Sequence, residues 1–295
     1  MPPSPAQRAM RHHAEELAAQ LPPLLVDAER VAITVSQGVH GRRRVGQGET
    51  FWQFRQYEPG EPAQRIDWRE SARSDRLYVR ETEWEASESV WIWRDSSPSM
   101  DYASTASLPT KRARGDLLAL ALAALLIRGS ERVTLLGSGY APATGMSVLN
   151  RLALVIERTD QPGTSLPAFE PLPRYGQLVM ISDLLSPLEE IDALARRFAA
   201  MGVKGHLLQV LDPVEETLPF EGRVKFEGLE NETDLLLSRV ETIRAQYEAR
   251  LRRHREGLMA MTQALGWTFA PHRTDRATTA ALLALYMALS RPAKM

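Results

Sequence analysis

Hydrophobic and polar positions follow different patterns in the two parts of this chain. From Glu88 onward, short apolar runs alternate with longer segments of helical periodicity, which predicts a parallel sheet with helical crossovers. We expect strands at 89–95, 132–137, 177–182, 203–211 and 267–271. We expect helices at about 111–128, 147–158, 187–201, 236–265 and 275–290, and a β-hairpin within 213–232.

The first 85 residues carry shorter and more mixed elements. The pattern predicts an amphipathic helix over 5–20 that ends at Pro22-Pro23, and short strands at 31–35, 51–57 and 77–85. A glycine-punctuated loop with three consecutive arginines spans 38–48, and a helical turn is expected within 66–74. We therefore expect two parts: a small β-containing N-terminal segment, residues 1–85, and an α/β domain, residues 86–295.

Composition excludes several classes of protein. The chain has 295 residues, a net charge of −1 and no cysteine, so nothing global attracts nucleic acid and no disulfide framework exists. Leu117–Ile127 is nearly all apolar but shorter than the about 20 residues that cross a bilayer, so it predicts a buried helix and no membrane span. The N-terminus lacks the apolar core of a signal peptide. These features predict a soluble, cytoplasmic protein.

Candidate chemistry begins where the first strand of the larger part ends. The aromatic and β-branched run 91–93 predicts a buried strand, and Asp95, Ser97 and Ser99 follow it at two-residue steps. One carboxylate and two hydroxyls at the carboxyl end of a strand suit Mg²⁺, a hard cation that binds oxygen. Alone this pattern is weak, because an ordinary Ser/Pro turn closing a strand has the same residues.

Two further features converge on this turn. Thr164 offers a hydroxyl in the Gly-Thr-Ser loop 163–165, and Asp183 directly follows the apolar run 178–182. In a doubly wound sheet the strands on either side of the switch point are neighbours, so both aspartates can face one cation. Asp183 taken alone would more simply cap the following helix. Together the features favour a shared site for Mg²⁺, or for Mn²⁺, which accepts the same oxygens.

These residues resemble a known constellation. Asp95, Ser97, Ser99, Thr164 and Asp183 match in order the metal-ion-dependent adhesion site of von Willebrand factor A-like domains. The stretch 38–85 resembles the signature of an uncharacterised bacterial family, number fifty-eight among the domains of unknown function. The resemblance implies a von Willebrand factor A-like, doubly wound, mostly parallel sheet with helices on both faces. It also implies that MoxR-type AAA+ ATPases are partners.

Two positions depart from the resemblance. Glu61 stands where the signature usually has Asp. Arg94 places a charge where the strand is usually apolar, and a cation beside Asp95 would compete with a metal for that carboxylate.

Enzymatic motifs are scarce. The chain has no G-x-S-x-G, no phosphate-binding G-x-x-x-x-G-K-[ST] and no H-E-x-x-H, and its six histidines lack ligand spacing. His206 lies inside a predicted strand and is expected to be a bonded core residue. We therefore expect a Mg²⁺-dependent protein-interaction module whose partner presents an acidic residue to the metal. The alternative is a metal-dependent hydrolase that uses Asp95 and Asp183.

Overall fold

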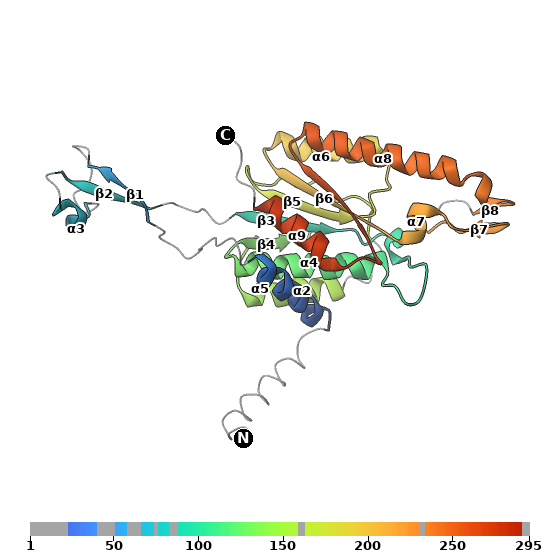
Figure 1. The fold of residues 1–295 in the computed structure, drawn as a ribbon, viewed down its shortest axis with the longest axis horizontal. Helices are drawn as coiled ribbons and strands as arrows, with labels where there is room; N and C mark the ends of the chain where they lie inside the picture. The colour runs from blue at the N-terminus through green and yellow to red at the C-terminus, as the bar shows by residue number, and fades with distance from the viewer. Residues whose placement is uncertain are drawn as a thin grey trace, which may run out of the picture. The chain divides into compact units, whose positions relative to one another are not determined.

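The chain forms two compact units, residues 41–87 and residues 1–40 together with 88–295 (Figure 1). The computed structural model describes residues 23–39, 51–57, 66–73, 76–82, 88–158, 163–229 and 234–290. The larger unit includes helix α2 (Pro23–Val39), which the expected division at residue 85 assigned to the N-terminal segment. The predicted helix over 5–20 and residues 40–48 of the arginine loop lie outside the described residues.

A five-stranded parallel sheet forms the centre of the larger unit. Its strands are β3 (Ser89–Arg94), β4 (Arg132–Leu135), β5 (Gln177–Ser182), β6 (Lys204–Leu211) and β9 (Thr268–Arg273). The spatial order is β4-β3-β5-β6-β9, and every neighbouring pair is parallel. The predicted α/β class is confirmed. The strand order reverses between β3 and β5, which is the switch point where such sheets bind ligands.

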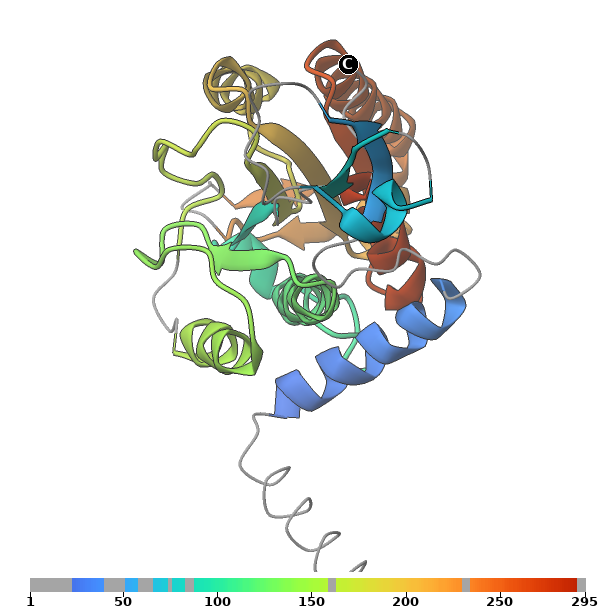
Figure 2. The same ribbon diagram turned by 90° about the vertical axis from the view of Figure 1, so that its left-hand side faces the viewer.

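Helices cover both faces of this sheet (Figures 1 and 2). One face packs against α4 (Lys111–Arg128), α5 (Met146–Glu157) and α9 (Thr278–Leu289), and the other against α6 (Leu188–Ala200) and α8 (Arg244–Ala264). Successive strand side chains point to opposite faces. Accordingly, Val90 and Ile92 of β3 join the first core, and Trp91 joins the second. This double coverage explains why the strands read as continuous apolar runs.

Helix α2 corrects one prediction. Val31–Val35 was expected to form a strand, but it lies within α2, whose buried residues are Leu25, Ala28, Ala32 and Val35. Their spacing of three and four residues forms one helical stripe, which packs on α4 (Figure 2). Since α4 lies between the sheet and α2, it is apolar around most of its circumference, as expected for a buried helix.

The segment after β6 also differs in part from the prediction. It forms the short helix α7 (Pro213–Thr217), a hairpin of β7 (Val224–Phe226) and β8 (Leu235–Leu237), and the 3-10 helix η3 (Val240–Thr242). The hairpin therefore extends beyond residue 232, and the helix predicted from 236 begins at Arg244. The periodicity was misleading here because Leu235–Leu237 pairs with β7 in an antiparallel ladder.

The smaller unit contains an antiparallel pair and one helical turn. Strand β1 (Phe51–Gln56) pairs with β2 (Tyr78–Thr82), and α3 (Trp68–Ser71) lies between them in the chain. The buried Ser71 side chain donates to the Asp67 carbonyl at 2.7 Å and accepts from the Tyr78 N–H at 2.9 Å. These contacts hold the turn against the strand. The predicted strands at 51–57 and 77–85 are confirmed over Phe51–Gln56 and Tyr78–Thr82, and the turn within 66–74 is confirmed by α3. Residues 83–85 lie outside the described residues.

Candidate metal centre

The Asp95 carboxylate lies at the switch point of the sheet, buried with 1% of the residue exposed. Its N–H donates to the Ile181 carbonyl at 2.8 Å, which continues the pairing with β5 past the end of β3. Its Oδ1 accepts from the Ser97 N–H at 2.8 Å, and its Oδ2 accepts from the Ser182 hydroxyl at 2.7 Å. The carboxylate is therefore held in place by its own turn and by the neighbouring strand.

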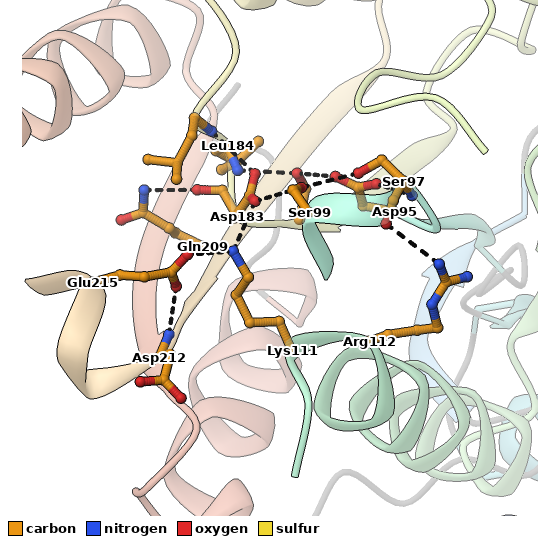
Figure 3. A network of polar contacts seen from close by, with 12 residues as sticks. Asp95, Ser97, Ser99, Lys111, Arg112, Asp183, Leu184, Gln209, Asp212 and Glu215 are labelled. Atoms are coloured by element: carbon orange, nitrogen blue, oxygen red, sulfur yellow. Dashed lines mark hydrogen bonds and ion pairs between the residues drawn. The ribbon is translucent and has the colours of Figure 1, made fainter. Parts of the chain in front are cut away.

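Two hydroxyls join Asp95 to the second aspartate (Figure 3). The Ser97 and Ser99 Oγ atoms lie 3.1 Å apart, and Ser99 Oγ donates to Asp183 Oδ2 at 2.8 Å. Pro98 begins a short 3-10 helix, η2 (Pro98–Asp101), with Ser97 at its N-cap position. The structure thus brings together four of the five predicted residues: Asp95, Ser97, Ser99 and Asp183.

Asp183 does not cap the following helix. The N-cap position of α6 is Pro187, whereas Asp183 Oδ1 accepts from the Leu185 N–H at 3.2 Å within the preceding loop. The Asp183 carbonyl also accepts from Gln209 Nε2 at 2.9 Å, which attaches the loop to β6. The simpler cap interpretation is therefore wrong.

Thr164 lies in a loop that meets the turn without placing its hydroxyl on the other site residues. The Gly163 N–H donates to the Ser96 carbonyl at 2.9 Å, and a Cβ at Gly163 would lie 2.2 Å from Ser96 Oγ. A side chain at this position would require the Ser96 hydroxyl to rotate away. The Thr164 hydroxyl donates to the Leu166 carbonyl at 2.5 Å.

Lys111 is a buried charged residue of the candidate site that the sequence analysis missed. Its Nζ lies 3.0 Å from Asp183 Oδ2 and 2.6 Å from Glu215 Oε1, and its side chain is 1% exposed. It is the first residue of α4, after the N-cap Thr110, where the helix dipole disfavours a cation. Burial also disfavours the ammonium, but Asp183 and Glu215 outweigh burial and raise the pKa of Lys111. Nothing local in the sequence distinguishes this lysine, because its partners are remote in the chain.

Arg94, whose charge was expected to compete with a metal for Asp95, pairs with a different carboxylate. Its Nε lies 3.1 Å from Asp116 Oδ1 on α4, and its guanidinium donates to the Ile156 carbonyl at 3.2 Å. Arg112 donates to the Ser96 carbonyl at 2.8 Å and to Asp101. Both arginines near the turn therefore pair with carboxylates outside the predicted site.

The donor set suits a hard cation. Burial raises the pKa of Asp95, the hydrogen bonds from Ser97 and Ser182 partly offset that effect, and the nearby charge of Asp183 adds to it. Among the described residues only these neutral groups donate to Asp95, so its charge lacks a paired cation. Adjacent ligands of octahedral Mg²⁺ lie about 3.0 Å apart, close to the Ser97–Ser99 separation of 3.1 Å.

The site would depend on hydroxyls as much as on carboxylates. Within the described ranges, no group of three or more His, Cys, Asp or Glu side chains is arranged to hold a metal. Two carboxylates and two serines would hold a hard cation such as Mg²⁺ in preference to a softer metal.

Comparison with known proteins places the chain in a family. The family model described as "Protein of unknown function DUF58" matches residues 53–257. The chain belongs to this family. Among its relatives, uncharacterised proteins of Mycobacterium bovis and Mycobacterium tuberculosis are each 26% identical over 279 residues, covering 88% of this chain and 86% of theirs.

Two solved structures resemble this member of the DUF58 family. The conserved hypothetical protein BatB from Bacteroides thetaiotaomicron aligns with a TM-score of 0.41 and 16% identity, covering 69% of this chain and 97% of that protein. An aerotolerance-related membrane protein from Bacteroides fragilis aligns with a TM-score of 0.40 and 17% identity, covering 68% and 98%. Of the helices in the described ranges, none is long and apolar enough to cross a membrane. The cytoplasmic location stays a prediction.

Proposed function

We propose that this DUF58 protein is a Mg²⁺-dependent protein-interaction module. Asp95, Ser97, Ser99 and Asp183 would hold the cation, and Mn²⁺ would bind the same oxygens. The bound cation supplies a positive centre for an acidic side chain of a protein partner. Thr164 would contribute only if its hydroxyl turned away from Leu166.

The observation that carries this proposal is the buried Asp95 carboxylate, which lacks a paired cation among the described residues and lies beside two serine hydroxyls. A buried, unpaired charge is costly, and a divalent cation would offset that cost. Hydroxyl ligands are neutral, so a cation that they hold keeps most of its charge for an external carboxylate. One such contact supplies specificity more than affinity.

The partner that we propose is a MoxR-type AAA+ ATPase. The support is the family membership, which strengthens the resemblance carried by 38–85, and the expected association of such proteins with these ATPases. The protein would then act as an adaptor whose bound cation recognises an acidic residue on the ATPase or on its client.

A pull-down with a MoxR-type ATPase from the same organism tests the proposal. Chelator alone is ambiguous because the ATPase also uses Mg²⁺, so the decisive comparison keeps Mg²⁺ constant. Asp95→Ala should lose the partner, whereas Asp192→Ala should retain it, because Asp192 is a partly exposed carboxylate that pairs with Arg196 within α6. Equal capture by Asp95→Ala and wild type would disprove the role of the metal site.

The hydrolase alternative receives less support from the geometry. Glu215, a carboxylate near the site, is already bonded to Lys111 and accepts from the Asp212 N–H at 2.8 Å, so it is poorly placed as a general base. Divalent-dependent hydrolysis that disappears in Asp95→Ala would establish the alternative.

A further inference from the structure

The Lys111 ammonium is a buried cation bonded to two carboxylates that follow different strands (Figure 3). Asp183 follows β5, and Glu215 lies on α7 after β6. Lysine is almost never fully buried unless it is paired, and a buried ion pair commonly brings little net stability. Stability alone therefore does not explain why a lysine occupies the first position of α4.

One oxygen of Asp183 has two partners. Oδ2 accepts from the Ser99 hydroxyl at 2.8 Å and from the Lys111 ammonium at 3.0 Å. A hydroxyl that donates its proton presents its oxygen as an acceptor, so Asp183 orients Ser99 toward binding a cation. The ammonium at the same oxygen compensates the negative charge of Asp183.

The two aspartates consequently differ in the charge that they offer. Asp95 receives neutral donors, whereas Asp183 receives a full positive charge through Lys111. Glu215 bonds the same ammonium at 2.6 Å, so it shares the charge of Lys111 with Asp183.

We propose that Lys111 is a positioning residue of the metal site: it neutralises Asp183, so that Asp95 supplies the charge that binds the cation. This inference rests on the proposed function. Its consequence is a cation bound less tightly than two charged aspartates would bind it, with correspondingly more positive charge available to a partner carboxylate.

The test uses Mg²⁺ alone as the probe, in calorimetric titrations of the full chain. The double variant Lys111→Met/Glu215→Gln keeps the net charge of the site but removes the cation from Asp183. The introduced glutamine would still offer a side-chain oxygen to the Asp212 N–H, which preserves the capping box of α7. We expect the double variant to bind Mg²⁺ about tenfold more tightly than wild type. If Lys111 had only a structural role, its removal would instead weaken Mg²⁺ binding.

The single variant Glu215→Gln is expected to change the Mg²⁺ affinity in the opposite direction. Glu215→Gln leaves Lys111 to pair with Asp183 alone, so Mg²⁺ should bind about threefold more weakly. A matched control is Lys225→Met, because Lys225 also pairs with two carboxylates, Glu227 and Asp234, but is 51% exposed on the β7–β8 hairpin. Its Mg²⁺ affinity should equal that of wild type.

The outcomes separate the inference from the proposed function. A wild-type chain that binds no Mg²⁺ disproves the proposed function, and this inference with it. A wild-type chain that binds Mg²⁺, together with a folded double variant that binds no more tightly, overturns the inference alone. If the double variant does not fold by circular dichroism, unchanged affinity in Glu215→Gln overturns it instead.

Discussion

Asp95 and Asp183 each directly follow one of two neighbouring parallel strands, β3 and β5, yet the structure gives them different surroundings. Both are buried, with 1% and 3% of the residue exposed. Asp95 accepts from the Ser97 N–H and from the Ser97 and Ser182 hydroxyls, whereas Asp183 accepts from a hydroxyl, an N–H and the Lys111 ammonium. The comparison teaches that strand order determines where the two carboxylates lie. Side chains remote in the sequence determine which carboxylate is paired with a cation.

The largest expected effect concerns the arginine beside Asp95. Arg94→Met leaves Asp116 buried and unpaired, which should cost about 3–5 kcal/mol of stability. Thermal and denaturant unfolding would measure the loss. The double variant Arg94→Met/Asp116→Leu should recover most of it, because apolar replacement of a buried pair is often neutral. If the double variant does not recover stability, the ion pair itself stabilises the fold around the site.

Titration of Asp116, the carboxylate of this ion pair, should make the free energy of unfolding depend on pH. Burial raises the pKa of Asp116 to about 6 from the ordinary 3.8, although Arg94 and Arg112 lower it. A raised carboxyl pKa contributes stability that is fully present below about pH 4 and is lost as the pH rises toward 6. The loss is about 3 kcal/mol in total.

Denaturation of wild type and Asp116→Asn between pH 4 and 7 isolates this contribution. Asparagine does not titrate, so the free energies of unfolding of the two proteins should change relative to each other by most of that amount over the interval. Parallel curves would contradict the assignment of the raised pKa to Asp116.

Isosteric variants compare the two aspartates directly. Asp95→Asn should weaken Mg²⁺ binding by about 100-fold, because it removes the charge without a paired cation. Asp183→Asn should weaken binding by about tenfold, because Lys111 already compensates that charge. Calorimetry measures both values, and equal losses would show that both aspartates carry equal charge toward the metal.

The smallest expected effect concerns Thr164. Its hydroxyl donates to the Leu166 carbonyl, so Thr164→Val should change Mg²⁺ affinity less than about threefold. Ser97→Ala in the same assay serves as the comparison and should weaken binding clearly more. A loss in Thr164→Val as large as that in Ser97→Ala would show that the loop turns its hydroxyl toward the metal.

Much of the fold could be predicted from local pattern alone. The five strands and helix 111–128 agree with the periodicity, because apolar runs buried on both faces of a sheet differ from helical stripes. The bonded core role of His206 is likewise confirmed: it is 4% exposed, and its ring bonds Gln177 and Thr268 at 2.9 Å each. Residues 31–35 could not be assigned correctly, because only packing on α4 decides between a helix and a strand there.

The sequence by itself determined where Asp95, Ser97, Ser99 and Asp183 would lie, because each follows a core strand directly and parallel strands end at one edge of the sheet. Only the tertiary structure decided which charged side chains pair with each other there. Lys111 meets Asp183 across 72 residues of chain, and Arg94 pairs with Asp116 instead of Asp95. The physical reason is that periodicity records burial and local geometry, whereas electrostatic pairing depends on distances that only the folded chain sets.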